Sequence, residues 1–209
     1  MPIINYYSGK RADSNYLYDL KGGINATLIG TLKPNGWVGF NGTSQYAYNT
    51  NWSGLGNSWT ITMLFRSSNY VSSGKSIFRV RPASGDGNEI RFGFSVSKIW
   101  GLIVDSAGSS GNKYKDYSGG TTLINNNTYI AQATWNGTDL NIYLDGKKET
   151  LTKTTDGSVT QSDTTRKLGI GGWDAVAYTL ADTNIIITRN EVLSPANLKN
   201  EFIYFKGFF

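Results

Sequence analysis

Apolar and polar residues alternate along several segments of the chain. Between Trp59 and Arg66 the apolar side chains occupy every second position, and the same alternation runs through residues 90–97 and 140–144. A period of two is that of a β-strand with one face buried and the other in water, as in antiparallel sheets. The run Ile185–Ile187 is apolar throughout, which predicts a strand buried on both faces.

Turn signals separate these segments. Asn-Gly and Asp-Gly pairs tolerate the positive φ angles of tight hairpins, and they occur at residues 35–36, 41–42, 86–87, 136–137, 145–146 and 156–157. A helix is predicted only from Ser194, which can cap it, with Pro195 in the first turn and an apolar pair at Leu198 and Phe202. The pattern predicts an all-β fold, a two-sheet antiparallel β-sandwich of jelly-roll type with one short C-terminal helix.

Composition adds limits to this picture. The 209 residues contain no long Pro/Gly/Ser linker and no internal repeat, so residues 1–209 are expected to form a single domain. The net charge is +5, but the basic residues are scattered, which favours a mildly basic surface over a nucleic-acid site. No apolar run approaches the roughly 20 residues of a membrane span, so no membrane insertion is expected.

The chain contains neither His nor Cys. This excludes Ser–His and Cys–His catalysis, and it excludes zinc sites built on His or Cys ligands. The N-terminal residues 1–7 lack the basic and apolar regions of a signal peptide. Synthesis in a cytoplasm, or a mature form of a processed chain, is therefore expected.

Six segments carry a family resemblance. They are YDLKGGINATL (18–28), FNGTSQY (40–46), WTITMLFR (59–66), YIAQATWNGTDLNIYLDGK (129–147), LGIGG (168–172) and IIITRNEVLSPANL (185–198). In this order and spacing they resemble the concanavalin A-like lectin/glucanase superfamily in its laminin-G-like form, as found in bacteriophage structural proteins. The resemblance implies two packed antiparallel sheets of a dozen or more strands. It departs from the family at Ile130–Ala131, where the family has two His, and at Ile186–Ile187, where it has an acidic pair.

Catalysis is not expected. Members of the superfamily that hydrolyse β-glucans need two carboxylates on one strand. None of the four Glu residues has an Asp two residues on or a Glu five residues on. The pairs Asp13 with Asp19 and Asp182 with Glu191 are too far apart in sequence for one strand face.

Glycan binding is a possible function of the aromatic residues near Asn-, Asp- and Gly-rich segments, since sugars stack on rings and bind planar polar groups. The candidates are Trp100, Tyr114, Tyr117, Trp173, Asp174 and Tyr178, and Trp52 lies in a further segment of this kind. Core packing is the alternative for any single Trp, and it is expected for Trp59 and Trp135. No cofactor is expected, although Asp105 or Asp174 could contribute to a rim calcium site.

Three arginines suggest a second surface. Arg79, Arg81 and Arg91 would share one face if the strands that carry them are neighbours. Such a face could hold an acidic or sialylated partner, or it could be a solvated sheet face protected by charge.

Three classes of protein fit these observations: a bacteriophage virion protein, a glycan-binding module of a bacterial surface or secreted protein, and an animal-type extracellular laminin-G domain. The resemblance implies the first, a non-catalytic head or tail fibre, decoration or receptor-binding module located in the virion. Its partners would be other virion subunits, copies of itself and surface glycans. Exposed strand edges would supply subunit contacts. The tail Phe208–Phe209 would either fold back onto the sandwich or dock on a neighbouring subunit. The second class is the alternative.

Overall fold

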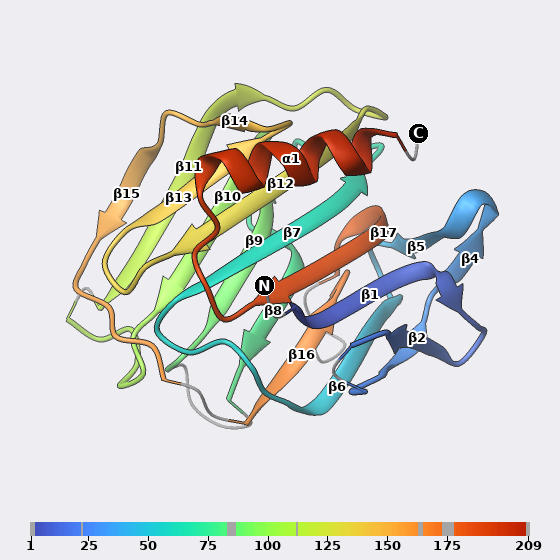
Figure 1. The fold of residues 1–209 in the computed structure, drawn as a ribbon, viewed down its shortest axis with the longest axis horizontal. Helices are drawn as coiled ribbons and strands as arrows, with labels where there is room; N and C mark the ends of the chain where they lie inside the picture. The colour runs from blue at the N-terminus through green and yellow to red at the C-terminus, as the bar shows by residue number, and fades with distance from the viewer. Residues whose placement is uncertain are drawn as a thin grey trace.

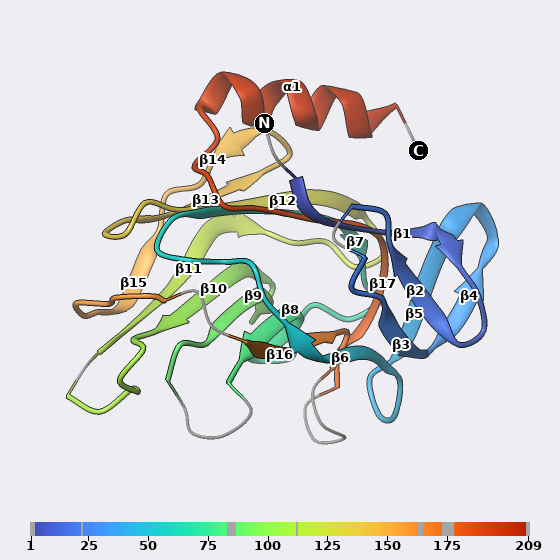
Figure 2. The same cartoon turned by 60° about the horizontal axis from the view of Figure 1, so that its bottom comes forward.

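Two antiparallel sheets face each other in the computed structural model of the chain, and one helix lies outside them (Figure 1). The structure describes residues 3–21, 23–82, 87–111, 113–162, 165–172 and 178–207. Figure 2 shows the helix α1 (Pro195–Lys206) against the outer face of one sheet, called here the helix-covered sheet. The other is called the open sheet. The all-β sandwich with a short C-terminal helix is therefore confirmed.

The helix-covered sheet has the strand order β14, β13, β12, β7, β17 and β1, and β5 with β4 extends it beside the start of β17. The bounds are β1 (Ile3–Ala12), β4 (Thr31–Lys33), β5 (Trp37–Asn41), β7 (Trp59–Arg66), β12 (Thr128–Trp135), β13 (Leu140–Leu144), β14 (Lys147–Lys148) and β17 (Leu180–Arg189). A short 3-10 turn, η1 (Pro34–Gly36), joins β4 to β5.

The open sheet has the strand order β15, β11, β10, β9, β8, β16, β6, β3 and β2. The bounds are β2 (Tyr16–Asp19), β3 (Ala26–Ile29), β6 (Tyr46–Trp52), β8 (Lys75–Arg81), β9 (Ile90–Ser95), β10 (Lys98–Val104), β11 (Tyr114–Thr122), β15 (Thr152–Asp156) and β16 (Arg166–Ile170). Because β2 also pairs with β1, the ladder of strands continues from one sheet into the other along one side of the sandwich. Within the described residues, β4, β14 and β15 each pair on one side only.

The main core fills the space between the sheets and contains three fully buried tryptophans. Trp59 and Trp135 are directly opposite each other on β7 and β12, which confirms their expected place in the core. Trp52 was grouped with possible binding loops, and that interpretation is wrong. It is the last residue of β6, its exposed fraction is 0%, and its ring packs edge-on against Phe78 in the core.

Strand β7 corrects the expectation of one wet face. Seven of its eight residues are buried, because α1 covers the outer face of the strand that the alternation placed in water. Ile185 and Ile187 lie beneath the helix and form a second apolar cluster with Phe205 of α1, whereas Ile186 lies in the main core. The prediction that residues 185–187 form a strand buried on both faces is thus confirmed.

The helix begins as the sequence predicts. Pro195 is its first residue, and the Ser194 hydroxyl accepts a hydrogen bond from the backbone N–H of Asn197 at 3.3 Å. Leu198 is buried beside Tyr143 and Leu193, whereas Phe202 packs against the second apolar cluster, which contains Phe205. Both predicted apolar residues therefore pack against the protein, but in different clusters. The tail Phe208–Phe209 lies outside the described residues.

A buried polar network also holds the helix on the sheet. Glu201 Oε1 is 2.5 Å from Arg189 Nη2, and the exposed fractions of the two side chains are only 9% and 8%. The second carboxylate oxygen, Oε2, accepts hydrogen bonds from the Thr62 hydroxyl and from Gln132 Nε2. The helix is therefore anchored by one charge pair in a region otherwise closed to water.

One hairpin illustrates the turn signals. Asp145 and Gly146 have φ angles of 49° and 75° and join β13 to β14, which confirms the predicted reversal. A different constraint applies to Gly171, which follows β16 with a φ of 71°. A Cβ there would overlap the ring of Phe40, which lies in the main core.

Gly171→Ala is expected to lower the free energy of unfolding by about 1–2 kcal/mol for the left-handed backbone and by about 1–3 kcal/mol more for the overlap with Phe40. Gly74→Ala is the matched control, since Gly74 also has a positive φ of 59° but nothing within 4 Å of a Cβ. Gly74→Ala should lower the free energy of unfolding only by the contribution of the left-handed backbone. Urea denaturation measures both losses, and equal losses would contradict the steric role of Phe40.

Candidate binding site

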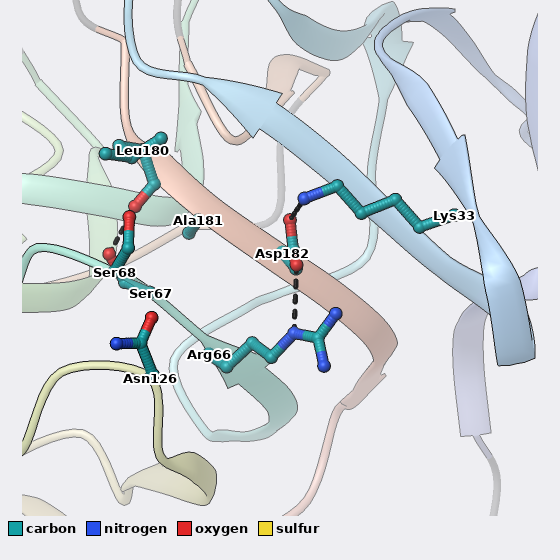
Figure 3. A pocket seen from close by; sticks show the side chains of 8 residues that line it. All are labelled: Lys33, Arg66, Ser67, Ser68, Asn126, Leu180, Ala181 and Asp182. Carbon is teal, nitrogen blue, oxygen red and sulfur yellow. Dashed lines mark hydrogen bonds and ion pairs between the residues drawn. The ribbon is translucent and has the colours of Figure 1, made fainter.

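A pocket of about 260 Å³ opens at one end of the sandwich, where three parts of the chain distant in sequence meet (Figure 3). Strands β4, β7 and β17 contribute charged side chains, and the loops after β7 and before β12 contribute polar ones. The lining residues are Lys33, Arg66, Ser67, Ser68, Asn126, Leu180, Ala181 and Asp182. Its volume lies just below the range of about 300–1,000 Å³ that drug-sized ligands fill, so it suits a group about the size of one sugar ring.

Asp182 organises the charges of this pocket. Its Oδ1 lies 2.6 Å from Lys33 Nζ and its Oδ2 lies 2.9 Å from Arg66 Nε, so one carboxylate holds two cations (Figure 3). Both cationic side chains stay partly exposed, at 41% and 38%. The guanidinium also lies over the ring of Trp37 at 4.5 Å from its centroid, which fixes its plane. The three charged groups together retain one positive charge.

The loops that line the pocket are braced from beneath. The Ser67 hydroxyl donates to the carbonyl of Leu180 at 2.5 Å, and the backbone N–H of Asn126 donates to the Ser67 carbonyl at 2.7 Å. The Tyr70 hydroxyl accepts from the Ser67 N–H and donates to the Asn127 carbonyl. Burial of that hydroxyl raises the pKa of Tyr70, so it stays a neutral donor.

The pocket combines three kinds of contact. Arg66 and Lys33 can bind an anion, the exposed Ser68 and Asn126 can bind hydroxyl groups, and Leu180 offers a partly exposed apolar side chain. Among the described residues that line the pocket, Asp182 is the only carboxylate. A pair of acids of the kind that most glycosidases use is therefore not formed by these residues.

Trp100 and Tyr114 were expected near a binding loop, but both are strand residues of the open sheet. Trp100 lies in β10 with an exposed fraction of 7%, and its indole N–H donates to Asp116 Oδ1 at 2.7 Å. Tyr114 is the first residue of β11 and is half-buried. Strand pairing places Trp100 opposite Ser118 and Tyr114 opposite Val104.

Tyr117 does not lie in a loop either. It is buried in β11 with an exposed fraction of 2%, and it belongs to the main core between the sheets. Its hydroxyl binds Asp156, which also pairs with Lys115 at 2.6 Å and with Lys153 at 2.8 Å. Burial raises the pKa of Tyr117, and the hydrogen bond from Lys115 lowers the pKa of Asp156. No sugar can stack on a ring in this position.

Tyr178 is half-buried and lies apart from the other candidates. Its ring centroid is 5.9 Å from that of Tyr46, and its backbone carbonyl accepts a hydrogen bond from Lys75 Nζ. Trp173 and Asp174 lie outside the described residues. The structure thus brings Trp100 and Tyr114 to neighbouring strands but does not join them to Tyr117 or Tyr178 in one site.

Asp105, considered for calcium, has other partners. Its carboxylate accepts hydrogen bonds from the backbone N–H groups of Ala107 at 2.8 Å and Thr160 at 2.7 Å, so it ties two loops together. Over the described ranges, no group of three or more Asp or Glu residues is arranged to hold a metal ion. In the same part of the chain, no helix is both long and apolar enough to cross a membrane.

The arginine prediction was conditional on strand order, and the condition is met. Strands β8 and β9 are neighbours, and Arg79 is directly opposite Arg91. Between them lies Glu89, whose side chain has an exposed fraction of 4%. No local sequence pattern indicates the pocket in Figure 3, because its charged residues are separated by up to 149 positions.

Comparison with known proteins shows the fold. No family model and no curated protein matches this sequence. Among solved structures, Trypanosoma rangeli sialidase in complex with sialic acid matches with a TM-score of 0.67 and 12% identity, over 99% of this chain and 33% of the sialidase. The binding domain of botulinum neurotoxin serotype D matches with a TM-score of 0.68 and 12% identity, over 97% of this chain and 51% of the toxin domain. The chain therefore spans a third to a half of these structures, which are similar in fold.

Proposed function

We propose that this protein is a non-catalytic glycan-binding module and that the pocket lined by Arg66, Lys33 and Asp182 binds an acidic sugar. The observation that carries the proposal is the arrangement in Figure 3, where one carboxylate fixes two partly exposed cations beside a hydroxyl and an amide. A sugar carboxylate would lie against the guanidinium fork and the ammonium group. The sugar hydroxyls would reach Ser68 and Asn126.

The fold comparison is compatible with this proposal. One similar structure is a sialidase holding sialic acid, an acidic sugar, and another is the binding domain of a neurotoxin. A sandwich of this kind serves both enzymes and binding modules, so the chemistry of the pocket has to decide between them. A single carboxylate that is already paired with two cations favours binding.

The test is a calorimetric titration with sialic acid and with glucuronate, and with glucose as the neutral control sugar. The acidic sugars should bind and glucose should not. Arg66→Ala should weaken the binding about tenfold or more, which corresponds to about 1.4 kcal/mol. Arg66→Lys should have a smaller effect, since it keeps the charge but loses the fork.

Two results would count against the proposal. Equal binding of glucose would show that charge is not recognised, and unchanged affinity of Arg66→Ala would place the site elsewhere. A thermal melt of each variant separates loss of the pocket from loss of the fold. Sialyllactose incubated with the protein should stay intact, and release of sialic acid would make the module an enzyme.

The family assignment, the location of the protein and the individual sugar-contact residues stay predictions from the sequence. The laminin-G-like assignment and the attachment role in a bacteriophage virion rest on the six sequence segments. Trp100, Tyr114, Trp173, Asp174 and Tyr178 stay candidates for sugar contacts. Mass spectrometry of purified virions tests the location, and the alternative is a module of a bacterial surface or secreted protein. Either location suits a glycan-binding role.

A further inference from the structure

Three aliphatic side chains are exposed on neighbouring loops at one end of the sandwich. Val71 lies in the loop after β7 (residues 67–74), Val96 in the turn between β9 and β10 (residues 96–97) and Ile124 in the loop before β12 (residues 123–127). These three residues are called here the apolar tip, and their exposed fractions are 64%, 62% and 61%. Single exposed apolar residues are normal on a protein surface, but a group of them on adjacent loops marks an interaction site.

Backbone hydrogen bonds hold the three loops side by side. The N–H groups of Val96 and Ser97 donate to the carbonyls of Ser72 at 3.3 Å and of Tyr70 at 2.8 Å. The N–H of Leu123 donates to the Ser97 carbonyl at 2.7 Å. Each residue of the apolar tip either makes one of these bonds or is next in sequence to a residue that does. The three side chains therefore belong to one surface.

Val96 has a backbone conformation that does not suit its side chain. Val96 and Ser97 have φ angles of 48° and 59° and form the two-residue turn of the β9–β10 hairpin. Such turns prefer Asn and Gly, and a β-branched residue with a positive φ is an outlier. The hydrogen bonds to Ser72 and Tyr70 hold the turn in place and offset this strain. Because the strained side chain is also exposed, it adds nothing to the core, which points to an external contact.

The residues around the apolar tip are uncharged or basic. The three loops contain no Asp or Glu and consist mainly of Ser and Asn. Lys75 and Lys98, the first residues of β8 and β10, directly follow two of the loops and are partly exposed. Lys75 Nζ donates to a backbone carbonyl, and Lys98 Nζ donates to a backbone carbonyl and to a hydroxyl. These acceptors are neutral, so both ammonium groups keep their positive charge beside the tip.

We propose that the apolar tip contacts the surface of a lipid bilayer that carries anionic headgroups. Val71, Val96 and Ile124 would enter the boundary between headgroups and acyl chains, with the Ser and Asn side chains at headgroup level. Lys75 and Lys98 would lie near the lipid phosphates, because an anionic bilayer surface attracts basic residues. The contact is peripheral, so it requires no membrane-spanning segment.

Two other occupants of the tip fit these observations less well. Hot spots between proteins are enriched in Trp, Tyr and Arg, whereas the one aromatic residue of the three loops, Tyr70, has an exposed fraction of 0%. A second copy of the chain would bring the same lysines against each other, and such like-charge contacts are unfavourable. The inference does not rest on the proposed sugar site, although Ser68 and Asn126 of these loops also line the pocket.

The test is co-sedimentation of the protein with vesicles of phosphatidylcholine and phosphatidylglycerol that contain no glycolipid. The protein should sediment with these vesicles, and less with vesicles of phosphatidylcholine alone. The double variant Val71→Ser with Ile124→Ser should lower the partition coefficient about tenfold or more, because it removes two aliphatic side chains from the apolar boundary. The matched control is Val192→Ser with Ile203→Ser, which removes the same residue types from exposed positions just before and within α1. It should change the partition coefficient less than about twofold.

Val96→Asn separates the external contact from a structural role of the turn. Asn adopts a positive φ more readily than Val, so this variant should raise the melting temperature of the protein. It should also lower the partition coefficient several-fold, since the tip loses an aliphatic side chain. A lower melting temperature with unchanged partitioning would assign Val96 to the fold and contradict the proposal.

Three further outcomes would overturn the inference. One is an equal loss in the tip and control variants, which would indicate unspecific adhesion. Another is equal sedimentation, or none, with vesicles that contain phosphatidylglycerol and vesicles that lack it. The third is a dimer in gel filtration that Val71→Ser with Ile124→Ser abolishes, which would identify a second copy as the occupant. Arg66→Ala should leave the partition coefficient unchanged, so failure of the sugar proposal and failure of this one give different results.

Discussion

Glu201→Ala is expected to lower the free energy of unfolding by about 3–5 kcal/mol, because it leaves the buried Arg189 without its carboxylate. The same change removes the acceptor of the Thr62 hydroxyl and one of the two acceptors of Gln132 Nε2, which keeps only its hydrogen bond to the Leu198 carbonyl. The helix would then lie on a sheet face that carries an uncompensated charge. Its apolar contacts through Leu198 and Phe205 would remain.

Urea denaturation of the purified protein measures this loss. Lys199→Ala is the control on the same helix, since Lys199 is exposed, and it should stay within about 0.5 kcal/mol of the parent. The double variant Arg189→Met with Glu201→Leu should recover most of the lost stability, because replacing a buried ion pair by apolar groups is often neutral. A loss below 1 kcal/mol for Glu201→Ala would show that water reaches the pair.

Glu89→Ala should have a comparable effect on the opposite face, again about 3–5 kcal/mol. Without this carboxylate, Arg79 and Arg91 face each other directly across the strands, and Arg79 has a side-chain exposed fraction of only 9%. The cost combines the loss of the Glu89 carboxylate beside a buried guanidinium with direct repulsion between neighbours.

A double-mutant cycle isolates this contribution. In the background of Arg79→Met, Glu89→Ala should cost clearly less than in the parent, because the repulsion is then absent. The stability of Glu89→Gln should lie between that of the parent and that of Glu89→Ala, since Gln keeps a hydrogen-bond acceptor but loses the charge. Identical costs in both backgrounds would mean that Glu89 acts on Arg91 alone. Urea midpoints again provide the measurement.

The sequence predicted those parts of the fold that local pattern determines. Ser194 and Pro195 mark the start of the helix, and the alternation from Trp59 to Phe65 marks a strand, because capping and strand period act over a few neighbouring residues. The alternation could not show that the outer face of this strand is also buried. The burial of that face depends on tertiary packing, because the helix that covers it begins more than 130 residues later in the chain.

The candidate site was beyond the reach of local pattern for the same reason. Lys33, Arg66 and Asp182 are each unremarkable in their own segments, and strand pairing alone brings them together. Asp182 was weighed only as half of a catalytic pair. Tyr117 was placed at the end of a glycine-rich loop that follows Asp105, yet it lies within β11 and packs in the main core. A strand of polar and small residues carries little periodic signal.

The ladder that joins the two sheets leaves few backbone groups open to a neighbouring chain. Among the residues that the structure describes, the three strands that pair on one side only are short, and each carries lysine: Lys33 in β4, Lys147 and Lys148 in β14, and Lys153 in β15. Short edges bearing lysine oppose strand-to-strand addition. Copies of this protein at high density are therefore not expected to pair edge strand to edge strand into fibrils. Any ordered array of copies is therefore expected to form through side-chain contacts rather than through strand addition.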